Sequence, residues 1–117
     1  MTNESSLDRT VLGELRELGG DELVAEIAVA YLADAANEVA ALHAAAAAGD
    51  AESLERVAHR FKSASGVVGA MVVSGYAEQL QHLGRAGSTE GAVELVHALD
   101  AAFRLAEAEL IPLQHAA

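Results

Sequence analysis

Hydrophobic residues recur at every third or fourth position along most of the chain, and this spacing predicts α-helices rather than β-strands. Short glycine-containing turns interrupt the pattern near residues 19–20, 49–50, 69–70 and 84–88. They divide the chain into a short helix after Asp8, helices over residues 21–48, 50–68 and 71–85, and a last helix from near Thr89 to Pro112. Long helices joined by short turns pack as antiparallel neighbours. We therefore predict an all-α fold, an antiparallel four-helix bundle with a short additional N-terminal helix.

The predicted helix ends carry capping residues. Asp8 is placed as the N-cap of the first helix, and Leu7 and Leu12 have the spacing of a hydrophobic staple around it. Gly49 is expected to end the second helix, and Asp50 is expected to cap the third. The boundary between these two helices is therefore predicted to within a residue or two.

Two further features concern the ends and the packing of the bundle. Residues 1–6 are polar, and we expect them to be frayed at the start of a single domain spanning residues 1–117. Gly75 lies inside the helix predicted over residues 71–85, where glycine costs roughly 1 kcal/mol relative to alanine. We therefore expect a neighbouring helix to approach closely at Gly75.

Composition limits the function classes that the chain can fill. A chain of 117 residues has room for one domain with one modest core. The absence of cysteine excludes disulfides, thiolate metal sites and a cysteine nucleophile, and it is consistent with a cytoplasmic protein. No apolar run has the length of a membrane span or the form of a signal peptide, so we expect no membrane association.

The net charge of −11 argues against nucleic acid as a partner, because nucleic-acid binding requires a basic surface. The charge is unevenly distributed, since residues 56–85 carry Arg56, Arg60, Lys62 and Arg85 against Glu78 alone. A locally basic patch on an acidic protein suits a phosphoryl group or an acidic partner. The alternative is four solvated side chains that cluster by chance.

The segment of residues 58–70, A-H-R-F-K-S-A-S-G-V-V-G-A, carries the candidate chemistry. The apolar stripe of its helix is formed by Leu54, Ala58, Phe61, Ala64, Ser65 and Val68. His59 lies off this stripe and is therefore predicted to be exposed near the middle of the helix. Lys62 follows one turn later, where it can neutralise an anion held on the imidazole ring. Small side chains beyond it leave room for another surface to approach.

This segment resembles the signature of the histidine phosphotransfer (HPt) family, roughly A-H-x-L-K-G-x-S-x-x-x-G-A. The matching residues are Ala58, His59, Lys62, Ser65, Gly69 and Ala70. Phe61 replaces the usual leucine and Ser63 the usual glycine, and the similarity in spacing extends nearly end to end. The resemblance implies that His59 accepts and donates a phosphoryl group. A neutral imidazole is a competent nucleophile near pH 7, because an unperturbed histidine has a pKa of about 6.5.

The resemblance also implies the partners. The phosphoryl group would be exchanged with the aspartate of a response-regulator receiver domain, or received from a hybrid histidine kinase. The receiver brings the Mg²⁺, so the chain, expected to be a monomer, needs no cofactor of its own. The residues expected to contact the partner are Arg56, Arg60, Ser63, Gly66 and Arg85. Without a glycine-rich phosphate loop, the chain is expected to be a phosphotransfer intermediate with no ATP-dependent kinase activity of its own.

In many family members a glutamine of the following helix hydrogen-bonds the inner ring nitrogen of the histidine. Gln81 stands at the matching distance, with Gln79 as the second choice. Fixing the inner nitrogen as a hydrogen-bond donor would select the tautomer and leave the outer nitrogen free to react. The alternative is a glutamine that is merely solvated. At position 63, the serine hydroxyl can either donate to the phosphoryl oxygens or crowd the ring.

Other interpretations of the polar residues are weaker. A di-iron bundle would need two E-x-x-H pairs, and only Glu94 and His97 have this spacing, so a metal site is not expected. The other histidines, which are expected to be solvated or partly packed, are His43, His82, His97 and His115. The alternative function is a helical adaptor that binds receiver or kinase domains without transferring phosphate. Loading of acid-labile phosphate would separate the two functions.

Overall fold

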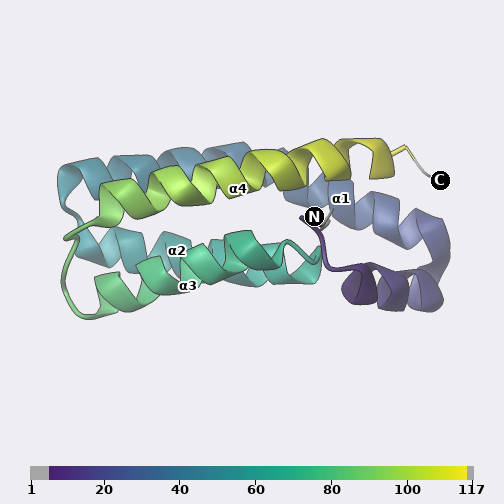
Figure 1. Ribbon diagram of the computed structural model, residues 1–117, viewed down its shortest axis with the longest axis horizontal. Helices are drawn as coiled ribbons and strands as arrows, with labels where there is room; N and C mark the ends of the chain where they lie inside the picture. Colours follow the sequence, from purple (N-terminus) through teal and green to yellow (C-terminus); the bar gives the residue numbers. More distant parts are fainter. Residues whose placement is uncertain (1–5, 116–117) are drawn as a thin grey trace, which may run out of the picture.

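The computed structural model describes residues 6–115, and these form a four-helix bundle with no strand. The helices are α1 (Arg9–Ala48), α2 (Ala51–Val67), α3 (Met71–Arg85) and α4 (Ala92–Leu113). Helix α1 packs against α2 and α4, and α3 packs against the same two helices, so the four close into a ring. Figure 1 shows α4 beside the second half of α1, with α2 and α3 forming the other layer. The all-α bundle is as predicted.

The short N-terminal helix and the long helix that follows it, both within α1, are separated by a kink at Gly20. Gly20 has φ 72° and ψ −168°, which is outside the helical region and is readily adopted only by glycine. The helix break predicted at Gly19-Gly20 is thus confirmed, and Gly20 is the residue whose backbone leaves the helical conformation. The first turns of α1 fold back toward the end of the α2–α3 pair (Figure 1), where the backbone N–H of Asp8 donates to the carbonyl of Gly69 at 2.8 Å.

The predicted caps at Asp8 and Asp50 are present. Asp8 Oδ1 accepts from the backbone N–H groups of Thr10 and Val11, at 2.8 and 3.3 Å. Asp50 Oδ1 accepts from the N–H of Ser53 at 3.1 Å, and the hydrogen bonds from Ser53 lower the pKa of the Asp50 carboxyl. These contacts fix where α1 and α2 begin.

At the chain ends the sequence-based boundaries were partly wrong. Ser6 was expected to be frayed, but its backbone N–H donates to Glu109 Oε2 of α4 at 2.6 Å; the rest of that segment, residues 1–5, lies outside the described residues. Helix α4 begins at Ala92 rather than near Thr89, because Gly91 has φ 78° and interrupts the helix there. Pro112 lies in the last turn of α4 instead of ending it, since a proline φ is compatible with a helix.

The core is centred on three aromatic rings. Tyr31 and Phe61 are stacked with ring centroids 5.6 Å apart, and Phe103 contacts both at 6.2 Å. The Tyr31 hydroxyl hydrogen-bonds the buried Ser65 hydroxyl at 2.8 Å, and burial raises the pKa of Tyr31 to about 12. On α2 the predicted apolar stripe is correct except at Ala64, which is exposed.

Helices α2 and α3 approach each other closely at Gly84, not at Gly75. A Cβ added to Gly84 would lie 2.6 Å from the carbonyl oxygen of Ala51 and 2.7 Å from the backbone nitrogen of Glu55, whereas one added to Gly75 would meet nothing within 4 Å. The expectation of a close approach at Gly75 is therefore wrong. Gly75 is compatible with open space, and Gly84, predicted as part of the turn, is a buried residue of α3.

Candidate functional site

His59 is exposed near the middle of α2, as predicted from its position off the apolar stripe. Ala58, directly before it, and Phe61, two residues after it, are almost completely buried. These two residues anchor the helix face opposite the imidazole. The ring is therefore presented to solvent from a rigid element.

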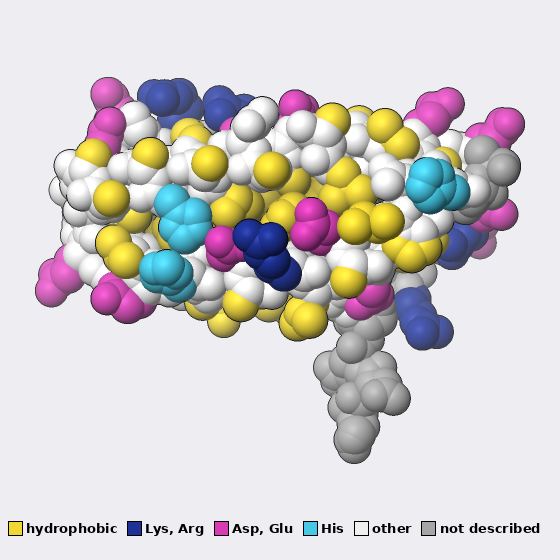
Figure 2. All heavy atoms as spheres, turned by 90° about the horizontal axis from the view of Figure 1, so that it is seen from above, with side chains coloured by type: hydrophobic (Ala, Val, Ile, Leu, Met, Phe, Trp, Pro, Cys, Tyr) yellow, Lys and Arg dark blue, Asp and Glu magenta, His cyan; other side chains and the backbone are white. Residues whose placement is uncertain are grey.

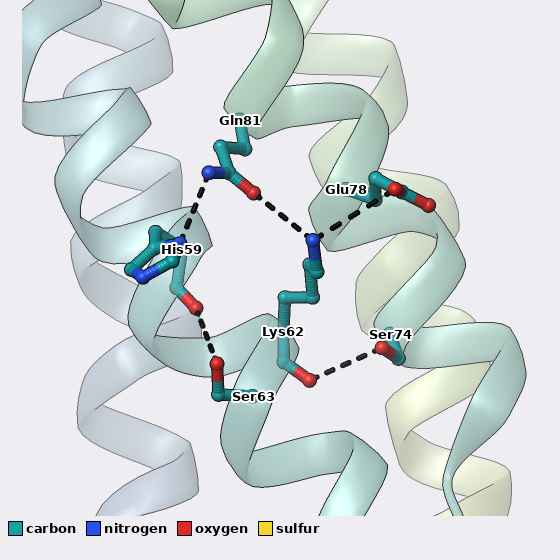
Figure 3. A network of polar contacts seen from close by, with 6 residues as sticks. All are labelled: His59, Lys62, Ser63, Ser74, Glu78 and Gln81. Atoms are coloured by element: carbon teal, nitrogen blue, oxygen red, sulfur yellow. Dashed lines mark hydrogen bonds and ion pairs between the residues drawn. The ribbon is translucent and has the colours of Figure 1, made fainter.

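Helix α3 supplies the polar partner of the ring. Gln81 is only 4% exposed, and its amide Nε2 donates to His59 Nδ1 at 3.0 Å (Figure 3). The contact predicted for Gln81 is thus present, and the alternative, Gln79, is exposed. The direction of the hydrogen bond is opposite to the one expected. An amide nitrogen can only donate, so Nδ1 accepts, and the neutral ring carries its proton on Nε2.

Lys62 explains this direction. Its Nζ lies 3.5 Å from Gln81 Oε1 and 3.8 Å from Glu78 Oε2, both on α3. Turning the Gln81 amide round would place its NH₂ group against the ammonium, so that two donors would face each other. Figure 3 shows Lys62 between Gln81 and Glu78, with the amide nitrogen directed at the ring. The cation therefore selects the amide orientation, and the amide selects the tautomer of His59.

Two serines satisfy backbone carbonyls around the site. Ser74 Oγ of α3 donates to the carbonyl of Lys62 at 3.1 Å, which ties the two helices together next to the lysine. Ser63 Oγ donates to the carbonyl of His59 at 3.3 Å, one turn back along α2. The serine at the family's glycine position therefore has its hydroxyl directed to its own helix (Figure 3).

Two of the three arginines of the predicted basic patch, Arg60 and Arg85, are paired with carboxylates. Arg60 Nε and Nη2 donate to the two oxygens of Glu38 at 2.8 Å each, and this hydrogen-bonded ion pair raises the pKa of Arg60. Arg85 Nε donates to Glu55 Oε2 at 3.0 Å. Both carboxylates lie outside residues 56–85, over which the sequence showed an excess of positive charge. Arg56 Nη2 contacts Ser53 Oγ at 3.5 Å.

Apolar side chains are exposed along and beyond the end of α2. Val67, Met71 and Val72 are 52, 49 and 56% exposed, at the end of α2 and the start of α3. A groove of about 550 Å³ between α1 and α2 reaches Val67 and has Arg60 at its edge. Gly66 lies one residue before Val67, and a Cβ there would just reach Ser74 Oγ at 4.0 Å. Small and apolar residues thus follow the histidine toward the end of α2 and the start of α3.

The other histidines belong to different surroundings. His43 Nε2 contacts Asp100 Oδ2 at 3.0 Å, and the rings of His43 and His97 are 5.3 Å apart. Figure 2 views the face of α1 and α4 and shows two histidines side by side there. His82 and His115 are exposed. Within residues 6–115 no three histidine or carboxylate side chains are grouped so that they could hold a metal ion, and no helix combines the length and apolarity needed to cross a membrane.

Comparisons with known proteins identify the family. The family model described as Hpt domain matches residues 26–109, which include the whole of the site. The crystal structure of histidine-containing phosphotransfer protein B (HptB) from Pseudomonas aeruginosa PAO1 is similar, with 29% identity, 96% of each chain covered and a TM-score of 0.87. No match was found among curated proteins. The chain belongs to the Hpt domain family, and its function is histidine phosphotransfer in a phosphorelay.

Proposed function

We propose that His59 carries the phosphoryl group on Nε2 and exchanges it with the aspartate of a response-regulator receiver domain. The observation that supports this most directly is the arrangement of the ring. Its inner nitrogen Nδ1 is hydrogen-bonded to Gln81, and the His59 residue as a whole is exposed. Mg²⁺ would come with the receiver. A hybrid histidine kinase is the other proposed source of phosphate, and we propose that the chain acts as a monomer.

In the transfer step the Nε2 lone pair attacks the phosphorus of the aspartyl phosphate. The P–Nε2 bond forms, the P–O bond to the aspartate breaks, and its electron pair stays on the carboxylate. For this attack the ring must hold its proton on Nδ1, so the Gln81 amide turns and its Oε1 accepts a hydrogen bond from the Nδ1–H group. In the resting protein the amide is held in the opposite, donating orientation by its contact with Lys62 at 3.5 Å, and it returns to that orientation once the loaded ring has released the Nδ1 proton to solvent.

Lys62 is the cation proposed to neutralise charge during transfer. Its side chain is one-third exposed, and its two contacts with α3, at 3.5 and 3.8 Å, are long. A phosphoryl group brings more negative charge than Glu78, so an ammonium within reach of both moves toward it. Phosphotransfer depends mainly on positioning and charge neutralisation, and one mobile cation beside the nucleophile serves both.

The proposed receiver-binding surface lies on α2 and at both ends of α3. It comprises Arg56, Arg60, Ser63, Gly66, Arg85 and the exposed Val67, Met71 and Val72. Because Arg60 and Arg85 are paired, they contribute less to long-range attraction than free cations would. Apolar contact around the histidine is therefore expected to supply most of the binding energy, as at the centres of other protein interfaces.

The test uses His59→Gln, with His82→Gln as the matched control on α3. Both are incubated with receiver domains charged by acetyl phosphate. We expect acid-labile phosphate on the wild type and on the control, and none on His59→Gln. Receiver binding by His59→Gln is expected to stay within about 1 kcal/mol of wild type, because the ring is one contact among many. Phosphate on the His59 variant would refute the assignment, and binding without loading of the wild type would show a non-catalytic adaptor.

A further inference from the structure

The hydrogen bond from Gln81 to His59 has a consequence for the phosphorylated protein. In the unphosphorylated ring this bond places the proton on Nε2, which is the nitrogen that must react. The observed arrangement is therefore not the one that attacks. It does match a ring that already carries phosphate, because substitution on Nε2 leaves Nδ1 with a free lone pair that can only accept.

We propose that Gln81, held by Lys62 in its donating orientation, keeps Nδ1 of the phosphorylated ring unprotonated and so slows the loss of phosphate to water. This inference rests on the proposed role of His59. Gln81 would be a positioning residue that protects the phosphohistidine after loading, in addition to orienting the ring.

The chemistry of hydrolysis gives the reason. Water attacks phosphorus, the P–Nε2 bond breaks, and its electron pair goes to the ring, while the water releases its protons and inorganic phosphate leaves. If Nδ1 carries a proton, the ring departs as neutral imidazole. If Nδ1 is unprotonated, the ring must depart as an imidazolate anion, which is a much poorer leaving group. A group that donates to Nδ1 favours the unprotonated ring and therefore the slow route.

The surroundings of Gln81 hold it in this orientation. Gln81 is almost completely buried between α2 and α3, so water has little access to its amide as an alternative hydrogen-bond partner. Its oxygen faces the ammonium of Lys62. That ammonium has three N–H groups, so it can keep Oε1 while approaching a phosphoryl oxygen. The same contact that orients the amide therefore remains possible after the ring is loaded.

Other titratable and charged side chains on the helices around the ring also influence how its protonation depends on pH. On α2 they are Glu55, Arg56, Arg60 and Lys62; on α3 they are Glu78, His82 and Arg85; and on α1 Glu38 is bound to Arg60. In the part of the chain that the structure describes, the hydrogen bond to Nδ1 comes from Gln81. A change at this position alters the protonation of Nδ1 while leaving these charges in place.

The experiment reverses the direction of the hydrogen bond. Gln81→Glu replaces the donor by a carboxylate of the same size, which accepts from a protonated Nδ1 and remains beside Lys62. Gln79→Glu, at an exposed position of the same helix, adds the same charge without touching the ring. Each protein is phosphorylated chemically with phosphoramidate and freed of reagent, and the loss of acid-labile phosphate is followed over a range of pH. Far-UV circular dichroism checks the fold.

We expect Gln81→Glu to lose phosphate about tenfold faster at neutral pH, with its rate–pH profile moved upward by about one pH unit. A neighbouring carboxylate favours the protonated ring, and a shift of about one unit is the smaller end of its usual effect on a pKa. Gln79→Glu should follow the wild type. Equal profiles for wild type and Gln81→Glu would overturn the inference. A wild type that takes up no phosphate on histidine would instead refute the proposed function, so the two failures are distinguishable.

A second measurement needs no substitution. Long-range ¹H–¹⁵N correlation spectra of the wild type report which ring nitrogen of His59 carries the proton. We expect the proton on Nε2 in the free protein and an unprotonated Nδ1 in the phosphorylated protein near pH 7. A proton on Nδ1 in the phosphorylated protein would contradict the inference even if Gln81→Glu failed to fold.

Discussion

Replacing Gly84 by alanine tests whether the close approach of α2 and α3 builds the site. The added Cβ would lie 2.6 and 2.7 Å from two backbone atoms of α2, those of Ala51 and Glu55. Neither atom can rotate away, because both belong to the backbone of helix α2. One helix must therefore move relative to the other by a few tenths of an ångström or more.

The expected cost follows from two opposing effects. Forcing an extra carbon into a packed interface costs up to about 3 kcal/mol, and contact with backbone places Gly84→Ala at this upper end. Alanine is the better helix former by about 1 kcal/mol. The net loss is about 2 kcal/mol, which lowers the melting temperature of a domain of this size by about 8 °C.

Gly75→Ala is the matched control, because it lies on the same helix and its Cβ meets nothing within 4 Å. It should gain about 1 kcal/mol and melt about 4 °C higher. Thermal and urea unfolding followed by circular dichroism measure both variants. Displacement of α3 should also lengthen the 3.0 Å contact between Gln81 and His59, so phosphate on Gly84→Ala should be shorter-lived. Two variants that both gain stability would show that the interface has room, and the reasoning would fail.

Two further predictions concern Tyr31 and Lys62. Because burial raises the pKa of Tyr31 to about 12 from 10.0, the unfolded chain loses this proton first, and wild-type stability should fall as pH rises from about 10 through 12. The Tyr31→Phe variant should lack this part of the decline, and near pH 7 it should be less stable by about 1 kcal/mol because the hydrogen bond to Ser65 is lost. Urea unfolding midpoints of wild type and variant at several pH values measure both effects. If the two stability–pH curves ran parallel above pH 10, the raised pKa of Tyr31 would be contradicted. Lys62→Ala should keep its helical content, seen by circular dichroism, and transfer phosphate more slowly from a charged receiver. A large drop in melting temperature with normal transfer would show a structural role instead.

The helices could be predicted because their signals are local. Caps at Asp8 and Asp50 act within three residues, and the apolar spacing along α2 identified its buried face apart from Ala64. Close approach between helices is not a local property. A glycine inside a helix looks the same in sequence whether it faces open space, as Gly75 does, or the backbone of another helix, as Gly84 does.

The features of the site also separate into those that local sequence or family resemblance predicts and those that depend on contacts between helices. The exposure of His59 and its contact with Gln81 were predicted, the first from periodicity and the second from family resemblance. The direction of that hydrogen bond was not, because it depends on Lys62 reaching across to the amide oxygen. The pairing of Arg60 with Glu38 was also missed, since a charge count over one segment omits carboxylates that other helices bring near.

Among the three cations of the patch that form ion pairs, Lys62 is held at the longest distance. Arg60 and Arg85 contact their carboxylates at 2.8 and 3.0 Å, in the range of charge-assisted hydrogen bonds, whereas Lys62 Nζ is 3.8 Å from Glu78. Moving an arginine to a phosphoryl group would break a well-formed pair, while moving Lys62 gives up only long contacts. An ammonium is also a compact charge on a flexible stem, which suits a ligand that arrives and leaves. On a chain with a net charge of −11, a loosely held lysine beside an exposed histidine is therefore better suited to phosphotransfer than a stronger but fixed basic patch.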